Sequence, residues 1–247
     1  ILLNLAGGEC VDELRKLEDD EGFCRVLRRI EQKGMTRRER RELDRRWRKE
    51  RNRSVPSPSS VFRFLSAFHD TTQEAKRVAC TAFIPPANKH LQGLSAVNAD
   101  MMAFVQKRNP QGIATLDQDA TLVATGKRES LYSYKGFSAY QPLNTWWAEQ
   151  SMVLHTEFRD GNVPAGHEQL RVLQEALALL PAEVEKVRLR SDTAGYQHAL
   201  LRYCEQGAHE RFGRIEFAVG CDVTAEFKKA VLDVEESEWS PVHKIYD

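Results

Sequence analysis

Two apolar segments that carry carboxylates constrain this chain most: residues 114–123 (ATLDQDATLV) and residues 187–196 (VRLRSDTAGY). Both have the composition of strands, and the second runs directly into a helical stretch. Side chains repeat their face every second residue along a strand, so Asp117 and Asp119 point the same way. Neighbouring carboxylates on a sheet are costly unless a cation or a proton compensates them. Together with Asp192 from the second segment, Asp117 and Asp119 predict a binding site for a divalent metal ion, as in phosphoryl-transfer enzymes.

The pattern after residue 112 predicts strands and helices in the order βββαβαβα. The predicted strands are residues 113–124, 134–143, 152–158, 184–190 and 215–219, and the predicted helices are residues 166–180, 194–205 and 224–231. A three-strand meander followed by βαβ units implies a mixed α/β sheet with helices on both faces. In the ribonuclease-H topology of this order the first and fourth strands are neighbours. Asp119 and Asp192 are therefore expected to lie close together.

The first part of the chain is expected to be mostly helical and basic. Residues 25–53 hold 14 Lys or Arg and 5 acidic residues, a local net charge of +9, although the whole chain has a net charge of 0. Such a block fits a polyanion such as DNA; the alternative is a solvated, salt-bridged helix. The turn at residues 109–112 (NPQG) divides the chain into a DNA-binding region, residues 1–112, and a catalytic core, residues 113–247. The candidate DNA contacts in the basic block are Arg37, Arg38, Arg41 and Arg45.

Several other classes of protein are disfavoured. The five cysteines are scattered and form no CxxC pair, which argues against zinc and a disulfide framework and favours the reducing cytoplasm. No apolar run approaches the roughly 20 residues of a membrane helix, and no signal peptide is visible. The chain begins without Met inside helical sequence, so we expect it to be a fragment.

The acidic motifs also have other interpretations. The segment DQDAT (117–121) fits the DxDxT signature of haloacid-dehalogenase-like phosphohydrolases, with Asp117 as nucleophile and Asp119 as general acid. An edge strand that exposes acids to water is the structural alternative. Asp192 is also a candidate N-cap, and Asp222 is expected to cap the helix at residue 224. A third class is a non-catalytic DNA-binding remnant, in which only the basic block matters.

Taken together, several motifs resemble one family. They are TLDQDAT (115–121), YKGF (134–137), YQPL (140–143), EFRDGNVPAG (157–166), LRSDTAGYQ (189–197) and FAVGCD (217–222). In order and spacing the chain resembles a bacterial insertion-sequence transposase of the DDE class, the IS1380 type. Residues 6–8, 56–59 and 64–70 resemble its N-terminal region, so the likeness spans nearly the whole chain.

The resemblance implies a ribonuclease-H-like core in which three acids hold two Mg²⁺ (or Mn²⁺) ions. Asp119 would be the first acid, with Asp117 as its alternative, and Asp192 the second. The reaction would be cleavage at transposon ends, followed by attack of the freed 3′-hydroxyl on target double-stranded DNA, in a homo-oligomer. Lys127 and Arg128 would contact phosphates near the site, although plain surface charge is the alternative.

One part of the family pattern is missing. The third acid, a Glu in a Tyr-Arg-Glu-like segment well downstream, has no counterpart among the 247 residues. We therefore expect this chain, incomplete at its C-terminus, to be inactive in strand transfer.

Overall fold

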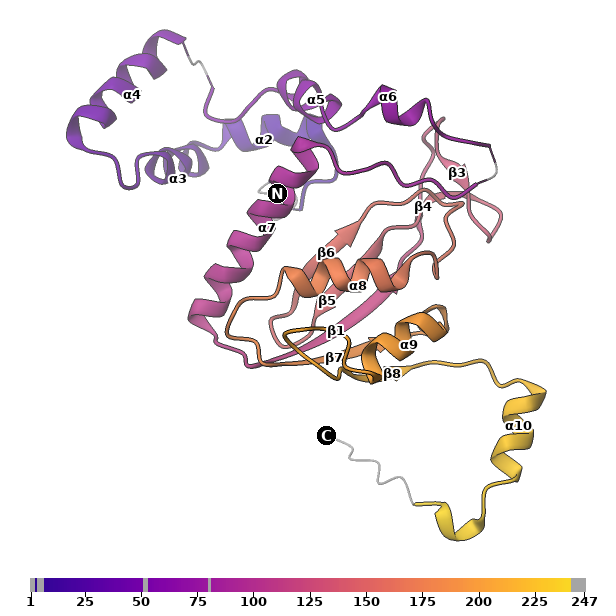
Figure 1. Cartoon of the computed structure of the whole chain (residues 1–247). Coiled ribbons are helices and arrows are strands. Elements are labelled where there is room, and N and C mark those ends of the chain that lie inside the picture. The colour runs from indigo at the N-terminus through magenta and orange to yellow at the C-terminus, as the bar shows by residue number, and fades with distance from the viewer. Residues whose placement is uncertain (1–2, 4–6, 51–52, 80, 241–247) are drawn as a thin grey trace. The chain divides into compact units, whose positions relative to one another are not determined.

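The computed structural model describes residues 3, 7–50, 53–79 and 81–240 (Figure 1). Their contacts divide the chain into two compact units. The first comprises the described residues up to Ala75 together with Ala87–Leu91, and the second comprises Lys76–Pro86 and the described residues from Gln92 onward. The boundary predicted at residue 112 falls inside the second unit.

The second unit is built on a five-stranded sheet in the order β6-β5-β1-β7-β8. Its strands are β1 (Ile113–Ala120), β5 (Leu143–Trp147), β6 (Met152–Glu157), β7 (Lys186–Ser191) and β8 (Glu216–Val219). The central strand β1 runs antiparallel to β5 and parallel to β7, and β8 runs parallel to β7. This is the mixed α/β sheet of the ribonuclease-H-like topology, and it confirms that the first and fourth strands of the predicted order are neighbours.

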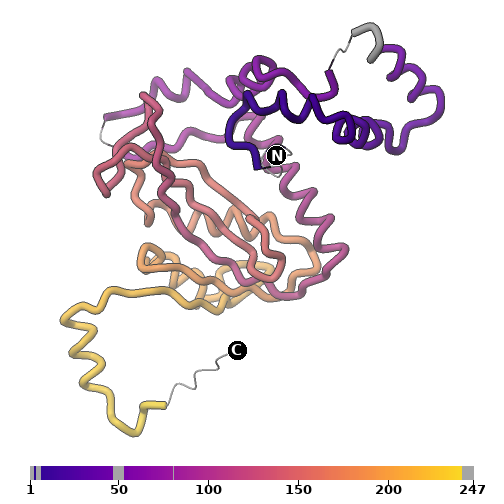
Figure 2. Tube along the Cα trace, turned by 180° about the vertical axis from the view of Figure 1, so that it is seen from behind, coloured from indigo at the N-terminus to yellow at the C-terminus, as the bar shows by residue number. Residues whose placement is uncertain are grey.

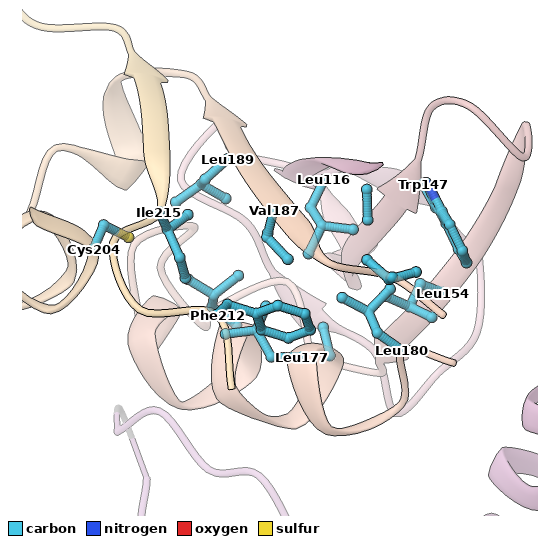
Figure 3. Close-up of a cluster of buried hydrophobic side chains, with 14 of the residues drawn as sticks. Leu116, Trp147, Leu154, Leu177, Leu180, Val187, Leu189, Cys204, Phe212 and Ile215 are labelled. Atoms are coloured by element: carbon cyan, nitrogen blue, oxygen red, sulfur yellow. The ribbon is translucent and has the colours of Figure 1, made fainter. Parts of the chain in front are cut away.

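Three helices pack against one face of this sheet. They are α7 (Lys89–Arg108), α8 (Gln169–Ala178) and α9 (His198–Glu205), and each supplies buried residues to one hydrophobic cluster. Figure 3 shows part of this cluster, with Leu116 of β1 and Val187 and Leu189 of β7 above the helix that carries Leu177. Because α8 and α9 both connect parallel strands in the same direction across the sheet, they lie on the same side.

The opposite face of the sheet carries charged side chains. Lys186, Arg188 and Arg190 of β7 are exposed there, because they alternate with the buried Val187 and Leu189. Seen from behind in Figure 2, the strands lie in front of the crossover helices. The expectation of helices on both faces was therefore wrong for the residues that the structure describes.

The predicted second strand, residues 134–143, was also wrong. The strand that pairs with β1 is β5, in which Leu143, Thr145 and Trp147 are buried and alternate with Asn144 and Trp146. Residues 134–143 instead hold β4 (Ser138–Tyr140), the middle strand of a small sheet with β2 (Val123–Ala124) and β3 (Leu131–Tyr132). The long first strand that we predicted is interrupted between β1 and β2.

Short helices make up the first unit, as the sequence predicts. They are η1 (Val11–Glu13), α2 (Leu14–Asp19), α3 (Glu21–Glu31), α4 (Arg37–Glu50), α5 (Pro58–Ser66) and α6 (Thr71–Glu74). Side-chain caps separate them: Asp20 accepts from the Phe23 N–H at the start of α3, and Ser57 accepts from the Ser60 N–H at the start of α5. The remaining elements are η2 (Thr193–Gly195), α10 (Ala225–Leu232) and η3 (Glu236–Glu238).

Within the described part of the chain, no helix is both long enough and apolar enough to span a membrane.

The two faces of β1 predict contrasting effects on stability. Leu116→Ala removes a fully buried side chain from the cluster and is expected to lower the free energy of unfolding by about 2–5 kcal/mol. Ile113→Ala, on the same strand but 37% exposed, is the control and is expected to cost less than about 1 kcal/mol. Urea denaturation followed by circular dichroism measures both. Equal effects would contradict the assignment of the two faces.

Candidate active site

The carboxyl ends of β1 and β7 bring the predicted acids together. In the parallel register, Gln118 of β1 lies opposite Ser191 of β7, and the Ser191 hydroxyl donates to the Gln118 carbonyl oxygen at 2.9 Å. The next residue along the chain is Asp119, still within β1, in one strand and Asp192, directly after β7, in the other. Ligands gather outside the carboxyl ends of strands in such sheets. Here a pocket of about 220 Å³ is lined by Asp117, Gln118, Asp119, Arg190, Ser191 and Asp192.

Asp119 presents its carboxylate to solvent. The residue is exposed, and the contact to it from the Thr121 hydroxyl is long, 3.5 Å from Oγ1 to Oδ2. Its neighbour Gln118 points to the opposite face, where it is buried and Nε2 donates to the Gln169 carbonyl at 2.9 Å and to the Gln169 side-chain oxygen at 2.7 Å. These bonds hold the end of β1 in register, so Asp119 projects from a fixed backbone.

Asp192 combines two positions that the sequence predicts. It directly follows β7, and its Oδ1 accepts from the Ala194 N–H at 3.0 Å, which caps the short helix η2. Gly195 makes this turn possible, because a Cβ there would lie 2.5 Å from the Ser191 Oγ. The cap occupies one carboxylate oxygen and fixes the direction of the side chain. The helix expected from residue 194 is thus divided, since α9 begins only at His198 with Gln197 as its N-cap.

Asp117 is held differently from Asp119, although both lie on the same face of β1. Both of its oxygens are engaged by Arg190 of β7, with Nε to Oδ1 at 2.5 Å and Nη2 to Oδ2 at 2.7 Å. The hydrogen bonds that the Arg190 guanidinium donates to Asp117 raise the pKa of the guanidinium above its usual value, so this arginine remains a cation. A carboxylate held in this bidentate way is less available to a metal ion than Asp119.

Arg190 is the residue of this site that sequence reasoning missed. The sequence of β7 did indicate that Arg190 is exposed, because charged and apolar residues alternate there and place Lys186, Arg188 and Arg190 on one face. The pairing partner could be identified only from the register, in which Asp117 lies opposite Arg190.

The cap predicted for Asp222 was wrong. Helix α10 begins one residue later than expected, and its N-cap is Thr224, whose Oγ1 accepts from the Phe227 N–H at 3.2 Å. Asp222 contributes instead a backbone carbonyl, which accepts from the Thr224 N–H. Thr and Asp are both good N-caps, so composition alone did not distinguish them.

The donor set at the pocket fits a hard divalent cation. Mg²⁺ is commonly bound through one or two carboxylates, with water and substrate phosphates completing its six ligands, and Asp119 and Asp192 supply two such groups. Among the described residues, no group of three or more His, Cys, Asp or Glu side chains is placed to hold a metal ion. The two aspartates are therefore candidate metal ligands and not a complete site.

The predicted DNA contacts fall on two elements. Arg37, Arg38, Arg41 and Arg45 are exposed on α4, where residues spaced by three or four positions share one side of a helix. Arg38 forms an exposed ion pair with Glu42 at 3.6 Å. Lys127 and Arg128 lie in the loop between β2 and β3, on the segment that follows the end of β1.

Comparisons with known proteins identify the family. The family model described as "Transposase DDE domain group 1" matches residues 1–244. No curated protein sequence matches the chain. Among solved structures, the chain is similar to the Mos1 transposase paired-end complex with left transposon end, at 14% identity and a TM-score of 0.30 over 91% of this chain and 70% of that chain. The Mos1 strand transfer complex is similar at 14% identity and a TM-score of 0.28, over 91% and 69%. Because the family model spans almost all of its length, this chain belongs to the group 1 family of DDE-domain transposases.

Proposed function

We propose that this chain is a transposase sequence of the IS1380 insertion-sequence type. Such a transposase cleaves DNA at transposon ends, and the freed 3′-hydroxyl then attacks target DNA. One observation carries the proposal: in a member of a DDE transposase family, Asp119 near the carboxyl end of β1 and Asp192 directly after the adjacent parallel strand β7 line one pocket. We place this activity in the cytoplasm, on double-stranded DNA, and expect a homo-oligomer in the active state.

Asp119 and Asp192 are the proposed metal ligands. A Mg²⁺ or Mn²⁺ pair bound there would stabilise the attacking and leaving oxygens of an in-line displacement at phosphorus. Asp119 offers an exposed carboxylate, and Asp192 offers the oxygen that does not cap η2. With divalent cations bound, the two acids would attract the scissile phosphate to the carboxyl ends of β1 and β7, where alone they would repel it.

Asp117 has a positioning role in this proposal. Its bidentate bonds hold the Arg190 guanidinium at the wall of the same pocket. Planar guanidinium groups recognise phosphate oxygens well. The same bonds disfavour the phosphohydrolase alternative, because a nucleophilic Asp117 would need a free oxygen to attack phosphorus.

DNA would be held mainly by phosphate contacts. The exposed arginines of α4 supply the charge, and Lys127 and Arg128 lie on the segment that follows the end of β1. Contacts of this kind neutralise phosphates and release counterions, so they give affinity that depends on salt and carries little sequence information.

Metal binding tests the roles of the three aspartates. Asp119→Asn and Asp192→Asn are each expected to weaken Mn²⁺ binding by at least about tenfold. Loss of a residue that only supports a metal ligand already weakens metal binding by about 10- to 100-fold, and these two variants each remove a proposed ligand. Asn caps helices as well as Asp does, so Asp192→Asn removes a ligand and keeps the cap. Calorimetric titration with Mn²⁺ measures the affinities.

Asp117→Asn is the matched variant for that titration. It removes a carboxylate from the same face of β1 but no proposed ligand, so its effect is expected to be smaller than that of Asp119→Asn. If Mn²⁺ binding instead depended on Asp117 and was indifferent to Asp119, the transposase site would be wrong. Turnover of a small phosphate ester that depends on Asp117 would then identify a phosphohydrolase.

Salt dependence tests the role of α4. Replacing Arg37, Arg38, Arg41 and Arg45 with Gln is expected to reduce the slope of log affinity against log salt by up to about 3.6, which is about 0.9 for each phosphate contact. The same four positions changed to Lys keep the charge and serve as the control. Fluorescence anisotropy with a duplex oligonucleotide measures the slope, and an unchanged slope in the Gln variant would mean that α4 is only a solvated helix.

Catalysis by this chain is expected to be absent. The family resemblance implies a third acid, a Glu in a Tyr-Arg-Glu-like segment that the 247 residues lack. Incubation with labelled transposon-end DNA and target plasmid at physiological Mg²⁺ is therefore expected to give no strand-transfer product on a sequencing gel. Full cleavage activity from this chain would show that two aspartates suffice, or that another group replaces the Glu.

A further inference from the structure

The small sheet is joined to the carboxyl end of β1, the strand that carries Asp117 and Asp119. Its residues leave the carboxyl end of β1, form β2, β3 and β4, and return at the start of β5 (Figure 1). The Thr121 N–H donates to the Pro142 carbonyl at 3.1 Å and so joins the two ends of the segment that forms the small sheet. Thr121 is two residues after Asp119, so DNA that reaches Asp119 also comes near the small sheet.

The small sheet is fixed to the turn after β6. Gly161 packs so closely that a Cβ there would lie 2.5 Å from the Ala139 carbonyl oxygen and 2.8 Å from that of Leu131. The Gln141 N–H donates to the carbonyl of Arg159 at 2.8 Å, and the Arg159 side chain is buried and paired with Glu157. The β3–β4 hairpin is therefore a rigid projection rather than a loose loop.

The tip of this hairpin is ordered by its own hydrogen bonds. Tyr132 pairs with Ser138 at the last rung, and the Ser133 N–H donates to the Phe137 carbonyl at 2.9 Å. Gly136 has a φ of +80°, a conformation that favours glycine. The loop thus presents Tyr134 and Lys135 in a defined turn.

Two tyrosine rings are exposed on this projection. Tyr132 is 70% exposed and Tyr134 is 75% exposed, so neither contributes to the core. The Lys135 ammonium lies 5.8 Å from the centroid of the Tyr134 ring, and the Lys127 ammonium lies 5.7 Å from that of Tyr140. Tyrosine is enriched at interaction surfaces, because its ring is apolar and its hydroxyl can form a hydrogen bond.

The charged residues near the two tyrosines indicate which kind of molecule would bind to this surface. Residues 121–142 carry Lys127, Arg128 and Lys135 against a single acid, Glu129. Aromatic rings interleaved with cations match nucleic acid, in which bases stack on the rings and phosphates meet the charges. A stacked duplex hides the faces of its bases, so an accessible base face requires an unpaired or displaced nucleotide.

We propose that Tyr132 and Tyr134 form a stacking platform for unpaired bases of the DNA end held at the Asp119–Asp192 pocket. The inference rests on the proposed function, because it assumes that DNA reaches this pocket. Lys127, Arg128 and Lys135 contact the adjoining phosphates. The platform keeps the DNA strand open beside the scissile phosphate and so sets which nucleotide enters the pocket.

Binding to two matched probes tests this platform. One probe is a duplex oligonucleotide, and the other has the same length with a central bubble of unpaired bases that contains 2-aminopurine. Without divalent metal, the chain is expected to bind the bubble about tenfold more tightly than the duplex, within the range for stacking of one base on an aromatic side chain. Stacking on tyrosine is also expected to quench the 2-aminopurine fluorescence.

The tyrosine variants separate this platform from the rest of the DNA-binding surface. Tyr132→Ala and Tyr134→Ala are each expected to lower the preference for the bubble about fivefold or more, while affinity for the duplex stays the same. Tyr134→Phe keeps the ring and is expected to behave as the wild type. Salt-dependent duplex binding without any preference for the bubble, or a preference that survives both alanine changes, would overturn the platform alone. Failure to bind either probe would contradict both the platform and the proposed function.

Discussion

The parallel pairing of β1 with β7 is the interaction on which the rest of the second unit depends. It joins segments separated by about seventy residues of sequence and aligns Gln118 with Ser191. The two crossover helices can then pack on one face, and Asp119 and Asp192 lie at the carboxyl ends of the two strands, where they line one pocket. A shift of one residue in this register would exchange the faces of β1 and send Leu116 to solvent and Asp117 into the core.

The side chains of β1 alternate between a face that packs against the helices and a face that carries the carboxylates. Leu116 and Gln118 face the helices, where one packs in the hydrophobic cluster and the other bonds to Gln169. Asp117 and Asp119 face away from the helices, and only Asp117 has a cationic partner on the neighbouring strand. Two carboxylates from one strand thus have different environments because one lies opposite Arg190 and the other lies beyond the last rung of the pairing.

Much of the fold could be predicted from the sequence, because the order of strands and helices limits the topology to few solutions. The neighbouring positions of β1 and β7 and the cap at Asp192 followed from that order and from local chemistry. The location of β5 did not, since the second strand was expected at residues 134–143, although the alternation from Leu143 onward is that of a strand. The Asp117–Arg190 pair could not be predicted, because it depends on the register between two strands that are distant in sequence.

The same pair affects the electrostatics of the pocket. Arg190 neutralises Asp117, which leaves Asp119 and Asp192 as the uncompensated anions among the residues that line the pocket. A phosphate group approaching this edge alone meets like charge, whereas a cation meets two partners. In the proposed site, a divalent ion held by Asp119 and Asp192 would remove the repulsion that the scissile phosphate meets at these two side chains. DNA contacts made by the basic and aromatic residues outside the pocket do not depend on that ion.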